Sequence, residues 1–455
     1  MTLTAAARPT TIDTTIAEHQ PPETAAEEGF AYDVAIVGLG YVGLPTALAY
    51  HHAGQRVLGV DVSSRRLDAI RSGAVDLVQG DRDRLVGALG DEGLTFSDDV
   101  SSIARAAAVI VCVPTPVDRY LVPDLAMLRA ACATVLRHVV RGQVIVLTST
   151  TYVGCTQDLL VEPLTEAGFT VGRDVFVAFS AERIDPGNDR VAQEAVPRVI
   201  GAATPECEEE AAALLGRAVD EVHRVPSLAA AEMTKLLENT FRAVNIALAN
   251  EFADVCQSLD IDVHTVIGAA ATKPYGFMAF QPGPGVGGHC IPCDPHYLLW
   301  QLRAARIEAP VISEAMTQIA ARPGRIVHRI RESLVQQVGT APRVLLLGVA
   351  YKPDVADVRE SPALEILQQL RDGGVEVAYV DPHVPLVALP DGTVLEALAE
   401  PEAFDPSLIF VHTRHAALDT SWIGADRIVF DATGALAPVV DQHDHVGFER
   451  MGARS

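Results

Sequence analysis

Cys290 ends the segment of this sequence whose residue types are best suited to covalent chemistry. The ten residues Gln281–Cys290 include four glycines and two prolines. Such a segment cannot form a regular helix or strand, and its backbone N–H groups can face an anion or a sugar. Asp294 follows four residues after the cysteine. The segment is therefore a candidate for a thiol nucleophile beside a ligand-binding loop.

Two other interpretations of Cys290 stay open on the residues alone. Cys290 and Cys293 form a C-x-x-C pair, which occurs in redox-active proteins and as half of a zinc site. A zinc site needs a second such pair or two histidines at ligand spacing, and the sequence offers neither, so no metal site is expected. The remaining alternative is an inert, buried thiol.

A segment without glycine or proline supplies two further polar candidates. Residues 227–267 are rich in Ala, Leu, Glu and Asn, which predicts one long helix or a helix pair. Lys235 and Asn239 lie four residues apart and therefore share a helix face. Taken alone, the two residues are typical of a solvated polar stripe on a helix that packs against a core.

The N-terminal half carries a dinucleotide-binding pattern. A short apolar strand at 33–37 leads into the turn Gly38–Gly43, which has the form Gly-x-Gly-x-x-Gly and opens a helix. Gly38 would make the tight turn, Gly40 would let a pyrophosphate approach the backbone, and Gly43 would let the helix pack close to the strand. This context makes the pattern much more specific than the three glycines alone.

An acidic residue completes this pattern. A second strand at 56–60 ends at Asp61, 21 residues after Gly40. Asp61 can accept hydrogen bonds from the ribose hydroxyls, and its charge would repel a 2′-phosphate, which favours NAD over NADP. Arg65 and Arg66 follow directly and would suit that phosphate, so the residues leave NADP as the alternative cofactor.

Short apolar segments continue the alternation of strands and helices along the chain. We predict further strands at 108–113, 143–148, 175–178, 343–348, 375–380, 408–411 and 427–431, and a helix at 362–371 opened by Ser361. This alternation is typical of parallel, doubly wound sheets, in which ligands bind beyond the carboxyl ends of the strands. The predicted fold class is α/β, with two Rossmann-like doubly wound units joined by a long central helix.

The expected domain boundaries follow from these elements. They give a disordered tail at 1–30, an NAD-binding Rossmann domain at 31–226, a central helical dimerisation region with the cysteine loop at 227–335, and a second Rossmann-like domain at 336–455. The last lacks Gly-x-Gly-x-x-Gly, so a second dinucleotide is not expected there. A chain of 455 residues is too long for a single core, which agrees with several domains.

Composition and charge exclude several classes of protein. A formal charge of −24 argues against general nucleic-acid binding, which needs clustered Lys and Arg. No apolar run approaches the roughly 20 residues that cross a bilayer, so no membrane partner is expected. The tail lacks the basic start and apolar stretch of a signal peptide, and seven scattered cysteines do not form a disulfide framework. The expected location is the cytoplasm.

Several segments in fixed order resemble the UDP-glucose/GDP-mannose dehydrogenase family, and most closely its UDP-N-acetylglucosamine 6-dehydrogenases. They are Val113–Asp118, Glu182–Asn188, Lys235–Arg242, Gly287–Pro292, Gly348–Asp354 and Arg359–Pro362. The family oxidises the C6 alcohol of a nucleotide sugar to a carboxylate. The resemblance implies NAD as cofactor, a UDP-sugar as substrate, and a homodimer or higher homo-oligomer paired through the central helix.

The resemblance also implies roles by position. The implied catalytic residues are Cys290 as nucleophile, Lys235, Asn239 and Asp294 around it, and Glu182 and Thr150 for proton handling and water placement. The implied cofactor contacts are Gly38, Gly40, Tyr41, Val42, Gly43, Asp61, Arg66, Thr115, Thr150 and Arg359. The implied substrate contacts are Glu182, Arg183, Lys235, Asn239, Gly283, Gly287 and Lys352.

Some positions depart from the family pattern. Cys293 stands where an apolar residue is common, Val153 where a proline is usual, and Ala320 and Arg322 where the family has Asn and Met. The identity of the hexose stays open among N-acetylglucosamine, N-acetylmannosamine and glucose. A sugar-nucleotide epimerase and a catalytically idle nucleotide-sugar binder are the alternatives from other classes, and neither needs a nucleophilic thiol.

Overall fold

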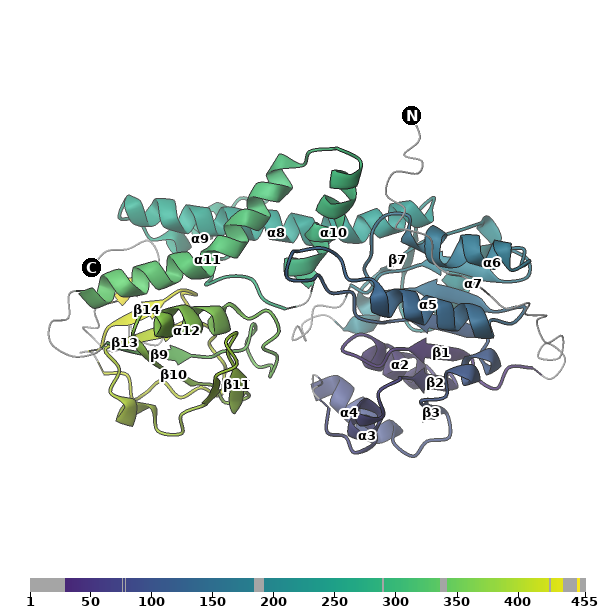
Figure 1. The fold of residues 1–455 in the computed structure, drawn as a ribbon, viewed down its shortest axis with the longest axis horizontal. Coiled ribbons are helices and arrows are strands. Elements are labelled where there is room, and N and C mark those ends of the chain that lie inside the picture. The colour runs from purple at the N-terminus through teal and green to yellow at the C-terminus, as the bar shows by residue number, and fades with distance from the viewer. Residues whose placement is uncertain are drawn as a thin grey trace. The chain divides into compact units, whose positions relative to one another are not determined.

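The computed structural model describes most of the chain as two compact units (Figure 1). The described residues are 29–75, 77, 79–183, 192–288, 290–335, 342–424, 427–436 and 448–450. The first unit comprises the chain up to Glu238 together with His296–Glu308, and the second comprises Asn239–Pro295 and the chain from Ala309 onward. The expected tail at 1–30 lies outside the described residues except for its last two positions, and so does His289.

An eight-stranded sheet forms the centre of the first unit. Its order is β3-β2-β1-β4-β5-β6-β7-β8, and the first six strands are parallel in the order of a dinucleotide-binding fold. β7 is antiparallel to β6 and parallel to β8. The strands are β1 Val34–Val37, β2 Val57–Val60, β3 Leu94–Ser97, β4 Ala108–Val111, β5 Val144–Leu147, β6 Phe176–Phe179, β7 Arg198–Ala202 and β8 Val222–Arg224.

Alternating side chains on these strands build two separate cores. Ala35 and Val37 enter one core and Val34 and Ile36 the other, because successive side chains of a strand point to opposite faces. The first core is covered by α5 Ala126–His138, the π-helical turn η2 Gln157–Val161 and α6 Glu162–Glu166. The second is covered by α2 Gly43–His52, α3 Ser64–Arg71, α4 Gln79–Ala88 and α7 Pro205–Leu215. This is the predicted doubly wound arrangement.

The glycine-free segment forms a helix pair, as predicted. α8 spans Leu228–Ser258, runs from the first unit into the second, and is followed by α9 Val263–Ala271. Asp260 breaks the helix with a left-handed φ of 56°, and the Asp262 carboxylate caps α9 by accepting backbone hydrogen bonds. Two further helices follow the glycine loop, α10 Cys290–Ala304 and α11 Pro310–Val335.

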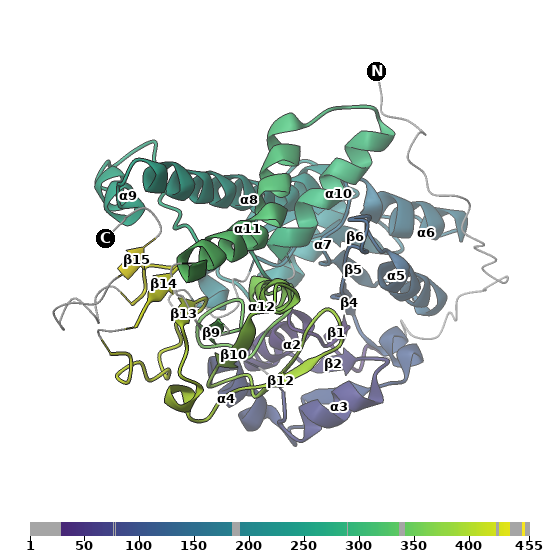
Figure 2. The ribbon, with the colours of Figure 1, turned by 60° about the vertical axis from the view of Figure 1, so that its left-hand side comes forward.

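A five-stranded parallel sheet forms the centre of the second unit. Its order is β10-β9-β13-β14-β15. α11 and α12 lie side by side against it (Figure 2), and together with α9 and the end of α8 they bury one face. The strands are β9 Arg343–Leu347, β10 Glu376–Val380, β13 Leu408–Val411, β14 Val429–Asp431 and β15 Phe448–Arg450, and α12 is Pro362–Asp372.

The local predictions hold in both units. Each of the nine predicted strands is present within two residues at either end, and Ser361 caps α12 through its hydroxyl, which accepts from the Ala363 N–H. Six of the strands within the described residues were not predicted, and they include the antiparallel β7 and the hairpin of β11 Leu386–Ala388 and β12 Val394–Glu396. The α/β class is confirmed. None of the described helices is long and apolar enough to cross a membrane.

Candidate active site

The glycine turn between β1 and α2 is built for close backbone approach. Gly38 has a φ of +90°, and a Cβ there would lie 2.6 Å from the Cys112 carbonyl oxygen. A Cβ on Gly43 would lie 1.8 Å from the Gly38 carbonyl oxygen, so α2 can start this close to β1 only with glycine. A Cβ on Gly40 would meet no protein atom within 4 Å. Protein packing therefore does not require glycine at position 40, whereas a ligand lying against the turn would.

Asp61 and Arg66 hold this turn from both sides. Asp61 Oδ2 accepts a hydrogen bond from the Leu39 N–H at 2.8 Å, and Arg66 Nε donates to the Leu39 carbonyl oxygen at 2.7 Å. Asp61 Oδ1 accepts from the Ser63 N–H at 2.9 Å. Arg66, expected to contact NAD, thus also fixes the peptide of the turn, and Tyr41 is exposed beside it.

Thr115 and Thr150 follow β4 and β5, at the carboxyl edge of the sheet. The Ser149 hydroxyl joins the two loops, because Ser149 Oγ accepts from the Val113 N–H at 2.9 Å and lies 2.8 Å from the Val113 carbonyl oxygen. Thr115 is buried and Thr150 is half-buried. These loops lie beside the point where the strand order reverses, between β1 and β4, where ligands of such sheets bind.

Glu182, at the end of β6, is the centre of a buried polar group in the first unit. Its carboxylate forms an ion pair with Arg198 and also accepts from the Arg183 N–H at 2.7 Å. Burial disfavours the charged form of Arg198, but the carboxylate outweighs this effect and raises its pKa. Lys235 Nζ donates to the Glu182 carbonyl oxygen at 2.7 Å, so α8 brings this lysine to the strand end.

Arg198 is a residue that sequence reasoning missed. It lies on β7, which was not predicted, and only 7% of its side chain is exposed. The other predicted contact, Arg183, is turned toward α8, where its guanidinium donates to Glu238 Oε1 at 2.6 Å. The ion pair with Arg198 therefore holds the Glu182 carboxylate in place. Its expected part in proton transfer stays a prediction.

Cys290 is the first residue of α10 and is exposed. Backbone N–H groups at a helix start have no partner within the helix and favour a thiolate over a thiol. Asp294 follows one turn later and is 1% exposed, and Asn239 Nδ2 donates to its carboxylate. Cys293 is buried. The second unit thus brings together Asn239 and Asp294, and the first unit brings together Lys235 and Glu182.

The glycine loop before Cys290 is fixed at its start by a buried arginine. Arg322 on α11 is fully buried, and its Nε donates to the Gly283 carbonyl oxygen at 3.0 Å. The same guanidinium donates to Asp254 Oδ1 on α8 at 2.6 Å, and the Gly283 N–H donates to Asn250 Oδ1 at 2.9 Å. Arg322 was visible in the sequence only as a departure from the family, and the structure shows it supporting the predicted loop.

The end of the same loop packs against the segment that carries Lys352. A Cβ on Gly287 would lie 2.5 Å from Tyr351 Cβ, and Gly288, with a φ of +82°, lies under the Tyr351 ring. The Gly288 N–H donates to the Arg359 carbonyl oxygen at 2.9 Å. The Arg359 guanidinium pairs with Asp357 at 2.7 Å. The predicted contact of Arg359 with NAD is not tested by this arrangement.

The glycine turn of the first unit, with Asp61 at the end of the next strand, is that of a dinucleotide-binding domain, and comparison with known proteins agrees. Residues 32–219, 229–319 and 345–438 match the NAD binding, central and UDP binding domains of the UDP-glucose/GDP-mannose dehydrogenase family. The chain belongs to this family and is an NAD-dependent nucleotide-sugar 6-dehydrogenase. The predicted family and the choice of NAD as cofactor are confirmed.

Three relatives illustrate the similarity. NDP-N-acetyl-D-galactosaminuronic acid dehydrogenase from Ralstonia nicotianae is 34% identical over 88% of this chain and 95% of its own length. UDP-N-acetyl-D-glucosamine 6-dehydrogenase from Pseudomonas aeruginosa is 32% identical over 77% and 83%. The solved structure of the UDP-D-ManNAc dehydrogenase from Pyrococcus horikoshii superposes with a TM-score of 0.81, at 31% identity over 92% and 99%.

Proposed function

We propose that the protein oxidises C6 of a UDP-N-acetylhexosamine to a carboxylate through a covalent adduct at Cys290. The Gly38–Gly43 turn and Asp61 would hold NAD, which would supply the hydride acceptor for both oxidations. The Cys290 thiolate adds to the C6 aldehyde to form a thiohemiacetal, the second oxidation converts this adduct into a thioester, and water releases the acid and the thiol.

The exposure of Cys290 is the observation that carries this proposal. All seven cysteines lie in the described part of the chain, and the other six are buried. Cys290 also follows a glycine loop and begins a helix, so it combines access, a glycine-rich loop and a favourable helix end. A redox or structural role for the thiol would not require the loop.

The polar residues that the family resemblance implies as catalytic suit the remaining steps. We assign to the Lys235 ammonium and the Asn239 amide the stabilisation of the oxyanions formed when the thiolate and then water add. Asp294, fixed by Asn239, and Thr150 position the water, and Glu182 takes part in proton transfer. A Lys235→Ala variant tests this assignment, because the loss of one oxyanion donor should lower kcat by about 10²–10³.

The names of the relatives favour an N-acetylated hexose. These names refer to N-acetyl-D-galactosaminuronic acid, N-acetyl-D-mannosamine and N-acetyl-D-glucosamine. We propose UDP-N-acetylglucosamine as the substrate, with UDP-N-acetylmannosamine and UDP-glucose as alternatives, and a hexuronate for surface polysaccharide as the product.

Turnover of purified protein tests these points. With each of the three UDP-sugars and NAD, we expect two NADH per sugar and the highest kcat/KM for an N-acetylated sugar. Cys290→Ser should abolish the acid product. Absence of NADH with all three sugars would refute the proposed substrate class, and full turnover by Cys290→Ser would refute the thioester.

We further propose that a second copy of the chain covers α8. Four large apolar side chains on the second-unit part of this helix, and Leu259 directly after it, are each at least 45% exposed, and spacings of seven, four, three and four residues place them on one stripe. They are Phe241, Leu248, Phe252, Val255 and Leu259. Sedimentation should give twice the chain mass of 48.4 kDa, and Phe252→Asp should halve it. A monomeric wild type would contradict the proposal.

A further inference from the structure

The second unit repeats the turn that binds the dinucleotide in the first. Gly38 and Gly348 each follow the first strand of a parallel sheet, with φ of +90° and +75°. Each N–H donates at 2.8 Å to the carbonyl oxygen of the last residue in the neighbouring strand. The next N–H donates, again at 2.8 Å, to the carboxylate directly after that strand, Asp61 in the first unit and Asp381 in the second.

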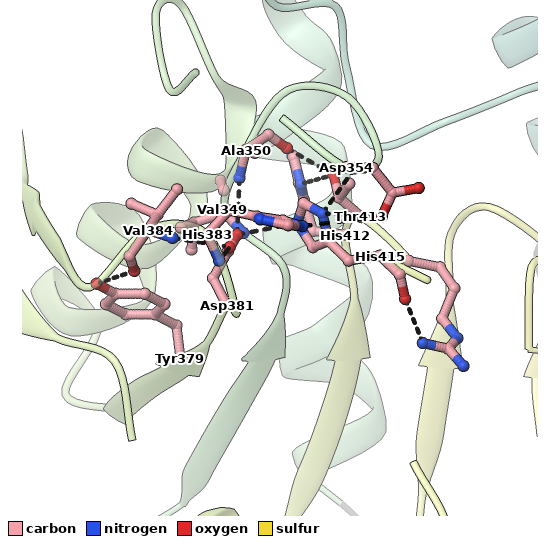
Figure 3. A network of polar contacts seen from close by, with 12 residues as sticks. Val349, Ala350, Asp354, Tyr379, Asp381, His383, Val384, His412, Thr413 and His415 are labelled. Atoms are coloured by element: carbon pink, nitrogen blue, oxygen red, sulfur yellow. Dashed lines mark hydrogen bonds and ion pairs between the residues drawn. The ribbon is translucent and has the colours of Figure 1, made fainter. Parts of the chain in front are cut away.

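The two carboxylates differ in what remains available to a ligand. Asp61 is half-buried and accepts from two backbone N–H groups. The side chain of Asp381 is fully buried, and it accepts five hydrogen bonds (Figure 3). The donors are the N–H groups of Val349, Ala350, His383 and Val384 and the imidazole of His415. Asp381 therefore has no acceptor left for a ribose hydroxyl.

His415 reaches this carboxylate from the strand on the other side of β9. It follows β13 and is fully buried, and its Nε2 lies 3.0 Å from Asp381 Oδ2. Its Nδ1 accepts from the Asp354 N–H at 2.9 Å, so Nε2 carries the proton and the ring is neutral. Asp354 Oδ1 in turn accepts from the Ala416 N–H at 2.7 Å. One imidazole thus ties both ends of the loop 348–354.

The loop that His415 and Asp381 hold carries a predicted substrate contact and a residue that packs against the cysteine loop. Lys352 lies within it, and Tyr351 packs against Gly287 and Gly288 of the cysteine loop. The Thr413 hydroxyl adds a third tie by donating to the Ala350 carbonyl oxygen at 2.6 Å. The loop 348–354 is thus held at its first three residues and at its last, which restricts the backbone conformations open to Tyr351 and Lys352.

We infer that Asp381 and His415 are positioning residues, which convert the second dinucleotide-type turn into a rigid support for Lys352 at the diphosphate of the sugar nucleotide. This inference rests on the proposed function, since it assumes that Lys352 meets the substrate. Asp381 and Asp61 would then have different roles. The Asp381 carboxylate binds backbone N–H groups of the protein, whereas the Asp61 carboxylate is expected to bind a ribose.

A metal ion is the competing explanation of this cluster. Asp354, His383 and His415 offer ligand atoms within 4.8 Å of one another, and within the described residues they form the one such group. His383 Nε2 is buried with no hydrogen-bond partner. However, the Nδ1 lone pair of His415 already accepts from the Asp354 N–H, and a metal would have to break that bond. The geometry therefore favours the hydrogen-bonded support.

Calorimetric titration with UDP and steady-state kinetics test the inference. His415→Ala should raise the Kd of UDP and the KM of the UDP-sugar about tenfold, with the KM of NAD within about twofold of wild type. His415→Gln, which keeps an N–H donor, should recover part of the loss and guards against misfolding of the alanine variant. Asp61→Asn is the reciprocal control and should raise the KM of NAD but leave the Kd of UDP unchanged.

The outcomes separate this inference from the proposed function. If the wild type does not bind UDP, the proposed function falls and the positioning role falls with it. If the wild type binds UDP and both His415 variants bind it equally well, only the positioning role is refuted. Nitrogen NMR of the ligand-free wild type should show the neutral, Nε2-protonated ring of His415. A shift of this signal on adding Zn²⁺ or Mn²⁺, with tighter UDP binding, would establish the metal site instead.

Discussion

Replacing Gly287 by alanine tests whether the glycine loop sets the position of the Cys290 thiol. The added Cβ would lie 2.5 Å from Tyr351 Cβ and 2.9 Å from the Glu360 carbonyl oxygen. Neither atom can rotate away, and ordinary contact begins at about 3.4 Å, so the segments must separate by roughly 0.9 Å. Cys290 follows three residues later and must move with the loop.

A displacement of this size has a predictable kinetic cost. Misplacement of a reacting group by about 1 Å costs about 10²-fold in rate. We therefore expect kcat of Gly287→Ala to fall about 100-fold in an assay of NADH formation. The rate of Cys290 alkylation by iodoacetamide, followed by intact mass, should change in parallel because it reports the same thiol without the substrate.

Gly268 in α9 supplies the matched control. A Cβ there meets no atom within 4 Å, so Gly268→Ala should leave kcat unchanged and stabilise the helix by up to about 1 kcal/mol. A folded Gly287→Ala variant with kcat within threefold of wild type would refute the reasoning.

Three further changes follow from buried or charged groups. Arg322→Met removes the donor to the Gly283 carbonyl and the partner of Asp254, and should lower the free energy of unfolding in urea by about 1–3 kcal/mol; an unchanged midpoint would contradict this. Burial lowers the pKa of His412 to about 3, whereas an unfolded histidine titrates near 6.5, so the unfolded state takes up the proton first. Stability should therefore fall by up to about 1.4 kcal/mol per pH unit between about pH 6.5 and 3, and His412→Asn should flatten that slope. Asp61→Asn should lower the preference for NAD over NADP at least about tenfold in kcat/KM, since the charge that repels the 2′-phosphate is gone; an unchanged ratio would place the discrimination elsewhere.

Features set by neighbouring residues could be predicted from the sequence. The turn Gly38–Gly43 requires glycine for reasons that lie within a few residues, and its strand, helix and Asp61 follow at characteristic distances. Ser361 caps α12 because a hydroxyl at that position reaches the first N–H groups of the helix. The helix pair at 227–267 could also be predicted, because this segment contains neither glycine nor proline.

Contacts between distant residues could not be predicted. Arg198 pairs with Glu182 only because β7 runs antiparallel to β6, and no periodicity of a single sequence reports that pairing. Arg322 meets Asp254, 68 residues away, through the packing of two helices. His415 and Asp381 follow two strands that both flank β9, so their contact depends on the strand order. Apart from the half-buried Asp254, these residues are polar and buried, a combination that the sequence alone cannot reveal.

The strand registers of the two sheets identify a position at which the two turns differ. Val37 pairs with Val111 in the first sheet as Leu347 pairs with Val411 in the second. Four residues beyond each partner stand Thr115 and His415, so a small hydroxyl residue stands in the first unit at the offset where the second unit has the closing imidazole. With the role inferred for His415, reopening the second turn to a nucleotide would have to begin with the removal of this imidazole. Thr115→His would bring an imidazole to the same offset in the NAD-binding turn.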